Sequence, residues 1–222
     1  MLTLPKVPSI LKPLVQPFRR YYLPLYREKA DREVGTFASF LSKDDILGEI
    51  GTHIGASTKF YSRHCKFVYT FEANKDIFDL TRRYLANCPN VSPFNIAISD
   101  HNGQSMFYAK SLSRENSVSG LLGRKYEKRV RVPCRRIDDL SCSARMTALV
   151  IDAEGSEVAV LEGAKRTLSH IERVAVETHL TNEMPEGTSA AVKERLKDFV
   201  NSFAVKSCDA AQELLVFQRS PS

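Results

Sequence analysis

Short apolar runs alternate along most of this chain with segments whose apolar residues recur at helical spacing. The apolar runs are predicted strands at residues 46–50, 67–71, 94–98, 148–151 and 174–177, and the helical segments are residues 56–64, 75–87, 156–168 and 189–202. Continuous apolar strands separated by helices are typical of a mostly parallel sheet covered by helices on both faces. The sequence therefore predicts an α/β, Rossmann-like fold.

Two parts of the chain depart from this alternation. Residues 106–109 and 130–134 alternate apolar and polar side chains around a serine-rich loop, as in an antiparallel excursion. Near the C-terminus, residues 203–206 and 214–218 form a second predicted antiparallel pair. A last strand that inserts into the sheet edge is characteristic of class I methyltransferases and is not found in dinucleotide-binding folds.

The length of 222 residues suits one domain with an appendage. We expect a basic arm over residues 1–40 and a ligand-binding domain over residues 41–222. No apolar run approaches the roughly 20 residues of a membrane helix. The five cysteines form no C-x-x-C pair, which indicates thiols in a reducing compartment, so we expect a cytoplasmic protein.

The net charge of +6 is unevenly distributed along the chain. Residues 1–33 contain seven Lys or Arg and three acidic residues, for a net charge of +4. Residues 124–136 contain seven Lys or Arg and one acidic residue, for a net charge of +6. The rest of the chain therefore has a net charge of 6 − 4 − 6 = −4. Val130 and Val132 alternate with arginines, which favours a solvated strand face. The alternative is contact with an anionic acceptor, a lipid headgroup or a nucleic acid.

Acidic residues stand near the end of each of the five strands predicted for the parallel sheet. They are Glu49, Glu72, Asp100, Asp152 and Glu177. Ligands of open α/β sheets bind at the carboxyl ends of the strands, so these side chains are the first candidates for a binding site.

The turn after the first strand, in ILGEIGTHIGAST, narrows the choice of ligand. It lacks the lysine of a nucleotide-binding P-loop, and His53 replaces the middle glycine of a dinucleotide fingerprint. Glu49 would repel a pyrophosphate but suits a positively charged ligand. S-adenosylmethionine fits this pattern, because it carries an adenine, a ribose diol, a sulfonium and an ammonium but no phosphate.

Each feature then has an expected role. Gly51 and Gly55 let the backbone approach the methionine part of the donor, Glu49 lies near its ammonium, and Glu72 accepts from both ribose hydroxyls. Asp100 accepts from the adenine amino group, although SDHNG is also strong turn chemistry. The predicted donor-binding residues are Glu49, Gly51, His53, Gly55, Ser57, Thr58, Glu72, Ala73, Asn74, Ser99, Asp100 and Asp152.

Five segments together resemble the FkbM-type methyltransferases. They are EIGTHIGAST, FEANKDIFDLTRRYLANCPNV, NIAISDHNGQ, VIDAEGSEVAVLEGA and VAVETH, in that family's order, over roughly residues 46–180. The resemblance implies a class I methyltransferase that usually methylates a hydroxyl oxygen, often on a sugar or a secondary metabolite. The chain departs from the family at Glu49, Thr52 and His53, and at Val150, where a lysine is common.

An alcohol oxygen needs a base to take its proton before it attacks a sulfonium methyl group. Asp152 is the first candidate, Glu154 the second, and His179 or His53 would be substitutes. Helix capping is the alternative role for Glu154 and also for Glu157. Asp152, Glu154 and Glu177 could instead hold a divalent cation, but no ligand spacing demands a metal site.

The acceptor is expected to be a small molecule or a sugar, and it could be anionic. Two alternatives remain open, a non-catalytic module that binds S-adenosylmethionine and a nucleic-acid methyltransferase. The second is not favoured, because the chain has no N-P-P-Y-like motif and shows little aromatic interleaving beyond Tyr126.

Overall fold

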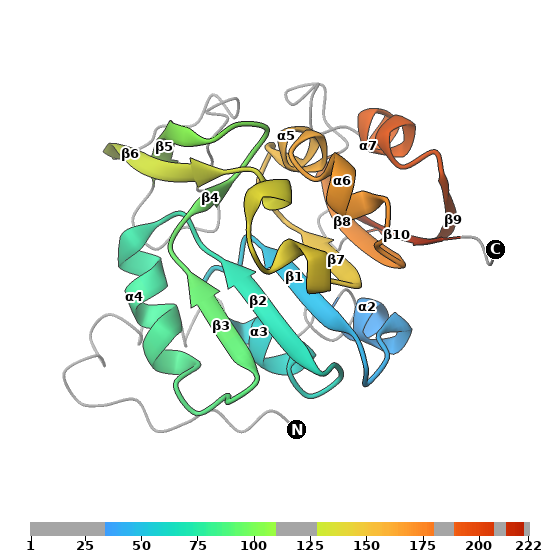
Figure 1. Ribbon diagram of the computed structural model, residues 1–222, viewed down its shortest axis with the longest axis horizontal. Coiled ribbons are helices and arrows are strands. Elements are labelled where there is room, and N and C mark those ends of the chain that lie inside the picture. The colour runs from blue at the N-terminus through green and yellow to red at the C-terminus, as the bar shows by residue number, and fades with distance from the viewer. Residues whose placement is uncertain (1–33, 110–127, 180–188, 207–211, 220–222) are drawn as a thin grey trace.

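The computed structural model describes residues 34–109, 128–179, 189–206 and 212–219. Its main sheet has seven strands in the order β3-β2-β1-β7-β8-β10-β9 (Figure 1). The strands are β1 Ile46–Ile50, β2 Phe67–Phe71, β3 Val91–Phe94, β7 Ala148–Ile151, β8 Arg173–His179, β9 Phe199–Lys206 and β10 Gln212–Arg219. The predicted strands at 46–50, 67–71 and 148–151 are thus confirmed to the residue.

The sheet is parallel from β3 to β8 and antiparallel at its other edge. β1 pairs in parallel with both β2 and β7, and β7 pairs in parallel with β8. The last strand, β10, lies between β8 and β9 and is antiparallel to both. The predicted insertion of a C-terminal strand is therefore confirmed, and the fold is a Rossmann-like sheet of the class I methyltransferase type.

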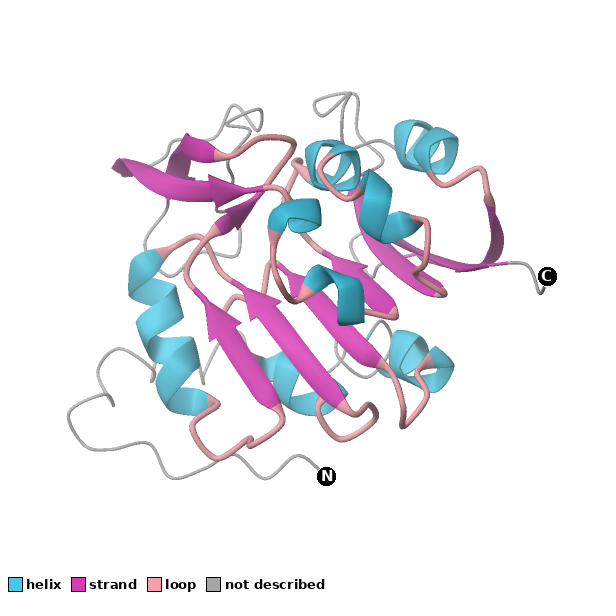
Figure 2. Ribbon diagram, viewed as in Figure 1, coloured by secondary structure: helices cyan, strands magenta, loops and turns pink. Residues whose placement is uncertain are grey.

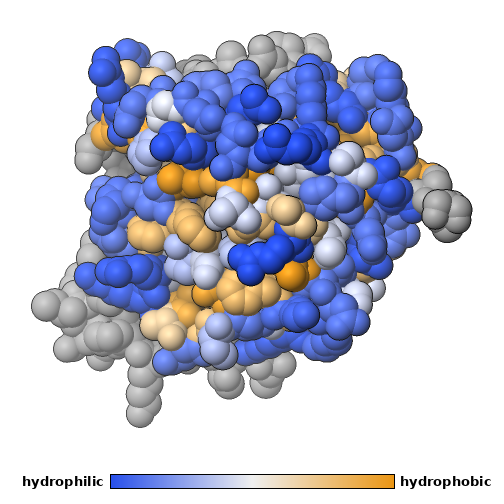
Figure 3. Space-filling model, in the orientation of Figure 1, coloured by the Kyte–Doolittle hydropathy of each residue, from blue (hydrophilic) through white to orange (hydrophobic). Residues whose placement is uncertain are grey.

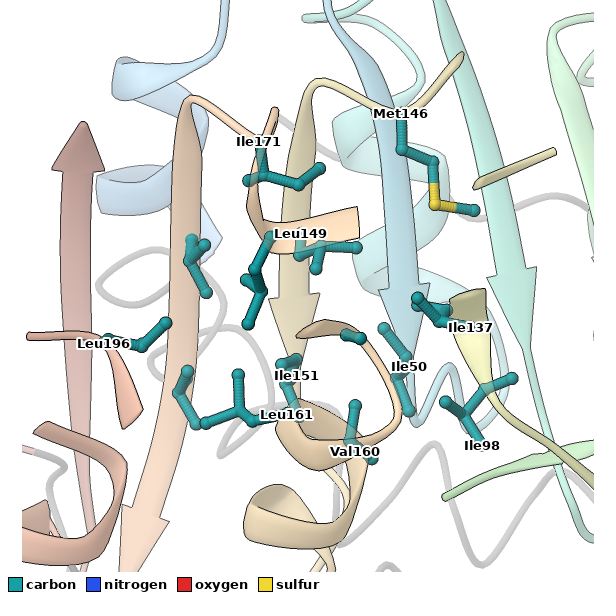
Figure 4. Close-up of a cluster of buried hydrophobic side chains, with 14 of the residues drawn as sticks. Ile50, Ile98, Ile137, Met146, Leu149, Ile151, Val160, Leu161, Ile171 and Leu196 are labelled. Atoms are coloured by element: carbon teal, nitrogen blue, oxygen red, sulfur yellow. The ribbon is translucent and has the colours of Figure 1, made fainter. Parts of the chain in front are cut away.

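Helices cover both faces of the sheet (Figure 2). On one face pack α2 Gly35–Phe40 and α3 Ala56–Tyr61, and on the other pack α5 Glu157–Glu162, α6 Lys165–Leu168, α7 Ser189–Arg195 and the 3-10 turns η3 Ile137–Asp139 and η4 Ser143–Arg145. The second face holds the larger core, in which Leu149 and Ile151 meet Leu161 (Figure 4). α4 Lys75–Tyr84 lies beside β3, at the sheet edge.

The predicted third strand at 94–98 is wrong. The chain forms β3 earlier and then a separate short strand, β4 Ala97–Ile98, which belongs to a second sheet. The Asn95 side chain explains the break, because its amide donates to the carbonyl oxygens of Glu72 at 2.8 Å and Ala73 at 3.2 Å. These hydrogen bonds hold the segment after β3 against the end of β2, where the chain leaves the main sheet.

The predicted helix at 156–168 is two short helices, α5 and α6, separated at Gly163. A Cβ at this position would lie 1.9 Å from the carbonyl oxygen of Ser99, so the chain passes closer here than a side chain allows. The predicted helix at 189–202 also ends early, at Arg195. Residues from Phe199 onward form β9 and pair with β10 instead, because this pairing satisfies backbone N–H and C=O groups of both strands.

The predicted antiparallel excursion is confirmed. β5 Gly103–Ala109 pairs with β6 Lys128–Arg135, and β6 also pairs with β4, so the second sheet has the order β4-β6-β5. This sheet lies beyond the carboxyl ends of the main strands (Figure 1). The serine-rich loop and residues 1–33 of the predicted arm lie outside the described residues.

One buried ion pair ties together the amino ends of the central strands. The Asp45 carboxylate accepts from Arg173 Nη1 at 2.9 Å and from Thr147 Oγ1 at 2.7 Å. Asp45 precedes β1, Thr147 precedes β7 and Arg173 begins β8. We call these three residues the amino-edge cluster.

Part of the larger-core face is open to solvent over β2 and β3. Apolar residues reach the surface there (Figure 3), and Phe94 is 38% exposed. Its ring stacks on that of Phe71 with 5.4 Å between centroids. Among the described residues, no helix is long and apolar enough to cross a membrane.

Candidate active site

Three acidic residues meet at the carboxyl ends of β1, β2 and β7. Glu49 and Glu72 are buried, and the negative charge of Asp152 acts on both of them. Gly51 joins the two turns, because a Cβ at this position would lie 1.7 Å from the Asp152 carbonyl oxygen. We call Glu49, Glu72 and Asp152 the carboxyl-edge cluster.

The turns after β1 and β7 share an unusual backbone conformation. Gly51 and Gly55 have φ of 88° and 82°, and Gly155 has φ of 95°. Among the described residues, only His53 (52°) and Glu154 (48°) adopt positive φ without being glycine. Such conformations cost about 1–3 kcal/mol each and concentrate at functional sites, so both turns are held in place by the surrounding structure.

The Glu49 carboxylate is used to hold the first turn. It accepts hydrogen bonds from Ser57 Oγ at 2.6 Å, from Thr70 Oγ1 at 2.8 Å and from Thr58 Oγ1. Burial raises its pKa above the usual range, and these hydroxyls oppose the rise. The hydroxyl protons of Ser57 and Thr58 therefore point to Glu49. These two hydroxyl groups cannot also donate hydrogen bonds to a bound methyl donor, which could contact only the other atoms of the two residues.

Val150, where the resembling family often has lysine, lies next to Glu49 in the register of β1 and β7. Its side chain is buried in the core under α2 and α3. The cation expected from the resemblance would thus have been a neighbour of Glu49. In this chain the carboxylate is surrounded by hydroxyl groups instead.

Glu72 bridges the turns after β1 and β2. One carboxylate oxygen accepts from the His53 backbone N–H at 2.9 Å, and the other accepts from the Asn74 N–H at 2.8 Å. Burial raises the pKa of Glu72 to about 7, and the charges of Asp152 and Glu49 add to this rise. Because each carboxylate oxygen can accept two hydrogen bonds, one position on each oxygen is left for a further donor.

The two residues after Glu72 have clear structural roles. The Asn74 side-chain oxygen caps α4 by accepting from the backbone N–H of Asp76 at 3.0 Å and of Ile77 at 3.4 Å. Ala73 packs against the core of the second sheet. The cap already occupies the Asn74 side-chain oxygen.

Three buried oxygens near the ends of β1 and β7 have no hydrogen-bond partner among the described residues. They are Thr52 Oγ1, Asp152 Oδ1 and Ser156 Oγ. An unpaired buried polar atom costs about 1–3 kcal/mol, so a ligand that satisfied these atoms would gain that energy. The sequence analysis missed Thr52 and Ser156 as site residues. Their only sequence signal is their position beside Gly51 and Gly155.

Glu157 holds the second turn. Its buried carboxylate accepts from the Gly155 N–H at 2.9 Å and from the Ala153 N–H at 3.2 Å. These bonds fold the turn back over the start of α5, but they reach N–H groups before the helix and so differ from the helix cap considered from the sequence. They also fix Glu154 in its left-handed conformation.

Asp100 comes from the second sheet, whereas the carboxyl-edge cluster comes from the main sheet. It follows β4 of the second sheet, and its side chain is 54% exposed. The carboxylate accepts from His101 Nδ1 at 2.7 Å and from Ser99 Oγ at 3.2 Å, and the bond from His101 lowers its pKa. The sequence placed Ser99 and Asp100 at the end of a main-sheet strand, and the structure corrects that placement.

The end of β8 brings two further candidates to the same edge. Glu177 is buried, and His179 is the last residue of the strand, although its side chain lies outside the described part of the structure. No group of three or more His, Cys, Asp or Glu side chains that could hold a metal ion occurs within the described ranges.

The family model named Methyltransferase FkbM domain matches residues 49–210. The chain belongs to the FkbM methyltransferase family. No curated protein sequence matches it. Because members of this family take the methyl group from S-adenosylmethionine, this FkbM domain is an S-adenosylmethionine-dependent methyltransferase.

Solved structures with the same fold are distant in sequence. The N-methyltransferase NodS from Bradyrhizobium japonicum is 10% identical with a TM-score of 0.55, covering 89% of this chain and 98% of its own. A tRNA methyltransferase from B. subtilis is 12% identical with a TM-score of 0.54, covering 85% and 66%. A Streptococcus pneumoniae protein solved with S-adenosyl-L-methionine is 13% identical with a TM-score of 0.53, covering 85% and 72%. At these identities the likeness shows the fold alone.

Proposed function

We propose that this FkbM domain transfers the methyl group of S-adenosylmethionine to a hydroxyl oxygen of a small molecule or a sugar. The observation that carries the proposal is the carboxyl-edge cluster. Its three acids have no Lys or Arg ion-pair partner in the described part of the chain. Buried charges are normally paired, so this cluster suits a cationic ligand.

The donor fits the oxygens that the fold leaves open. Glu72 can accept one ribose hydroxyl on each carboxylate oxygen, because its backbone partners use only one position on each. Thr52 Oγ1 and Ser156 Oγ can accept from the donor's ammonium or donate to its carboxylate. Glu49 holds the turn and contributes negative potential near the donor's ammonium.

Asp152 is the proposed general base. S-adenosylmethionine, when bound, supplies an electrophilic methyl group beside the end of β7. Asp152 Oδ1 is a buried acceptor without a described partner, so it can take the proton of an acceptor hydroxyl. A positioned base contributes about 10²–10⁴ in rate. Glu154 is the second candidate, held at φ 48° two residues further along the same turn, and His179 is the third.

A reducing compartment such as the cytoplasm suits the thiols. Cys65, Cys134 and Cys142 are free and buried. Burial raises the pKa of Cys65 to about 12 and also raises that of Cys142, so both remain protonated and unreactive at neutral pH. These cysteines therefore serve as packing residues.

Isotope-labelled donor tests the proposal directly. Cell extract is incubated with the protein and methyl-labelled S-adenosylmethionine, and mass spectrometry locates the label. We expect a labelled small molecule or sugar whose methyl group is ether-linked to oxygen. A label on nitrogen would contradict hydroxyl transfer, and no label in any fraction, with the donor bound, would favour a non-catalytic binding module.

A further inference from the structure

The second sheet has one buried face and one exposed face. Phe107, Val132 and Cys134 are buried on the inner face and pack with Ala97. The outer face presents the exposed side chains of Arg129, Arg131, Pro133 and Arg135 on β6 and of Gln104 and Met106 on β5. We call this surface, with the partly buried Tyr108 at its end, the arginine face.

The position of the arginines in the sheet is informative. Charged side chains on edge strands commonly prevent sheets from pairing with one another. Here Arg135 pairs with Ile98 of β4, but Arg129 and Arg131 stand on a stretch of β6 that pairs with β5 alone and is therefore an edge among the described strands. Edge protection is therefore one role for Arg129 and Arg131, and their surroundings decide whether they also bind an anion.

These arginines also lack acidic partners. Within the described residues, no Asp or Glu forms an ion pair with Arg129, Arg131 or Arg135, whereas the neighbouring Arg136 approaches two acids, Asp138 and Asp139. Side chains two residues apart on a strand are about 7 Å apart, so Arg129 and Arg131 repel each other. A bound anion would relieve this repulsion.

The chemistry of the arginine face suits nucleotides. Guanidinium groups match phosphate through two parallel hydrogen bonds. The Arg129 guanidinium lies 5.4 Å from the ring centroid of Tyr108, and Met106, opposite Arg131, is 41% exposed. Bases stack on aromatic rings and on guanidinium planes. One exposed methionine offers too little apolar surface to anchor a lipid bilayer.

We infer that the arginine face binds a single-stranded nucleic acid, with Arg129 and Arg131 on neighbouring phosphates and Arg135 on a phosphate further along the strand. The sequence alone favoured a solvated strand face. The missing acidic partners and the Tyr108 ring beside the Arg129 guanidinium change that balance. The inference concerns binding and goes beyond the proposed methyl transfer.

The test measures binding of a fluorescent oligouridylate of about twelve nucleotides by anisotropy, without any methyl donor. Each phosphate contact on a single strand contributes a slope of about −0.7 to log K against log salt, so three contacts predict about −2. We expect R129Q/R131Q to make that slope shallower by about 1.4, and Arg135→Gln alone by about 0.7. The affinity should fall in parallel at low salt.

The matched control is R82Q/R83Q, which removes two exposed arginines of α4. It should leave the slope near the wild-type value. An equal change in both double variants would mean that only net charge matters, and absence of binding at about 50 mM salt would mean a solvated face. Binding of phosphatidylserine vesicles or polygalacturonate that depends on the arginine face, without binding of the oligonucleotide, would also overturn the inference. None of these results bears on methyl transfer.

Discussion

The two edges of the main sheet treat buried carboxylates differently. At the amino edge, Asp45 is paired with Arg173 and hydrogen-bonded to Thr147, so its charge is compensated within the fold. At the carboxyl edge, Glu49 and Glu72 are buried beside Asp152 with hydroxyl and backbone N–H partners but no described cation. The first arrangement stabilises the fold, and the second leaves negative potential for a ligand.

The largest expected effect comes from Asp152→Asn. This change keeps the shape of the side chain and an acceptor oxygen but removes the charge that takes a proton. Single-turnover methyl transfer should fall by about 10²–10⁴, with donor affinity and melting temperature nearly unchanged. Wild-type transfer in the folded variant would remove Asp152 from the mechanism and favour Glu154 or His179.

Arg173→Met tests the amino edge. It leaves the buried Asp45 carboxylate without its cation. Breaking a fully buried ion pair in this way costs about 3–5 kcal/mol of unfolding free energy. We expect about 2–3 kcal/mol here, because the Arg173 side chain is 22% exposed. Urea unfolding measures the loss, and donor affinity should not change. A stable variant would show that this pair does not compensate Asp45.

Glu72→Gln is the matching test at the carboxyl edge. It removes a charged acceptor of ribose hydroxyls, so donor binding should weaken by about 1.5–3 kcal/mol, which is on the order of ten- to a hundredfold in dissociation constant. Unlike Arg173→Met, it removes a buried charge, but the Gln amide nitrogen cannot accept the second backbone N–H, so the two effects on the unfolding free energy at pH 8 oppose each other. A large loss of stability would place Glu72 among the structural carboxylates.

The smallest expected change in donor affinity is a pH dependence carried by Glu72. Its folded pKa of about 7 lies above the ordinary 4.5, so the folded state binds more protons between these values. The unfolding free energy should therefore fall as pH rises from 4.5 to 7, and this component should be absent in Glu72→Gln. Donor affinity should change in the opposite direction.

The pH dependence of donor affinity is measured by calorimetry in two buffers of different ionisation enthalpy. Because the donor favours the charged carboxylate, binding near pH 6.5 should release protons and tighten by about three- to tenfold between pH 6 and 8. If the wild-type protein bound the donor without releasing protons, the raised pKa of Glu72 would have no role in donor recognition.

The sequence predicted the parts of the fold that local patterns determine. Apolar runs bounded by turns located β1, β2 and β7, and the acids at their ends pointed to the site. The departure of the chain after β3 depends on Asn95, which acts through a long-range bond to β2. The break at Gly163 likewise depends on a distant carbonyl, that of Ser99.

Within the site, residue types were predictable and partners were not. The sequence identified Glu49 and Glu72, but the hydroxyls that hold Glu49 come from β2 and α3. The same holds for Thr52 and Ser156, whose unpaired oxygens become evident only once the surrounding donors and acceptors are placed. Hydrogen-bond satisfaction is a property of the folded chain.

Donor selectivity tests the central claim most directly, namely that the uncompensated carboxyl edge binds a cationic, phosphate-free adenosine ligand. Isothermal calorimetry would compare S-adenosylmethionine and S-adenosylhomocysteine with NAD and ATP. We predict measurable binding of the first two, with no measurable binding of the others, because Glu49, Glu72 and Asp152 repel phosphates. NAD bound more tightly than S-adenosylmethionine would contradict the claim.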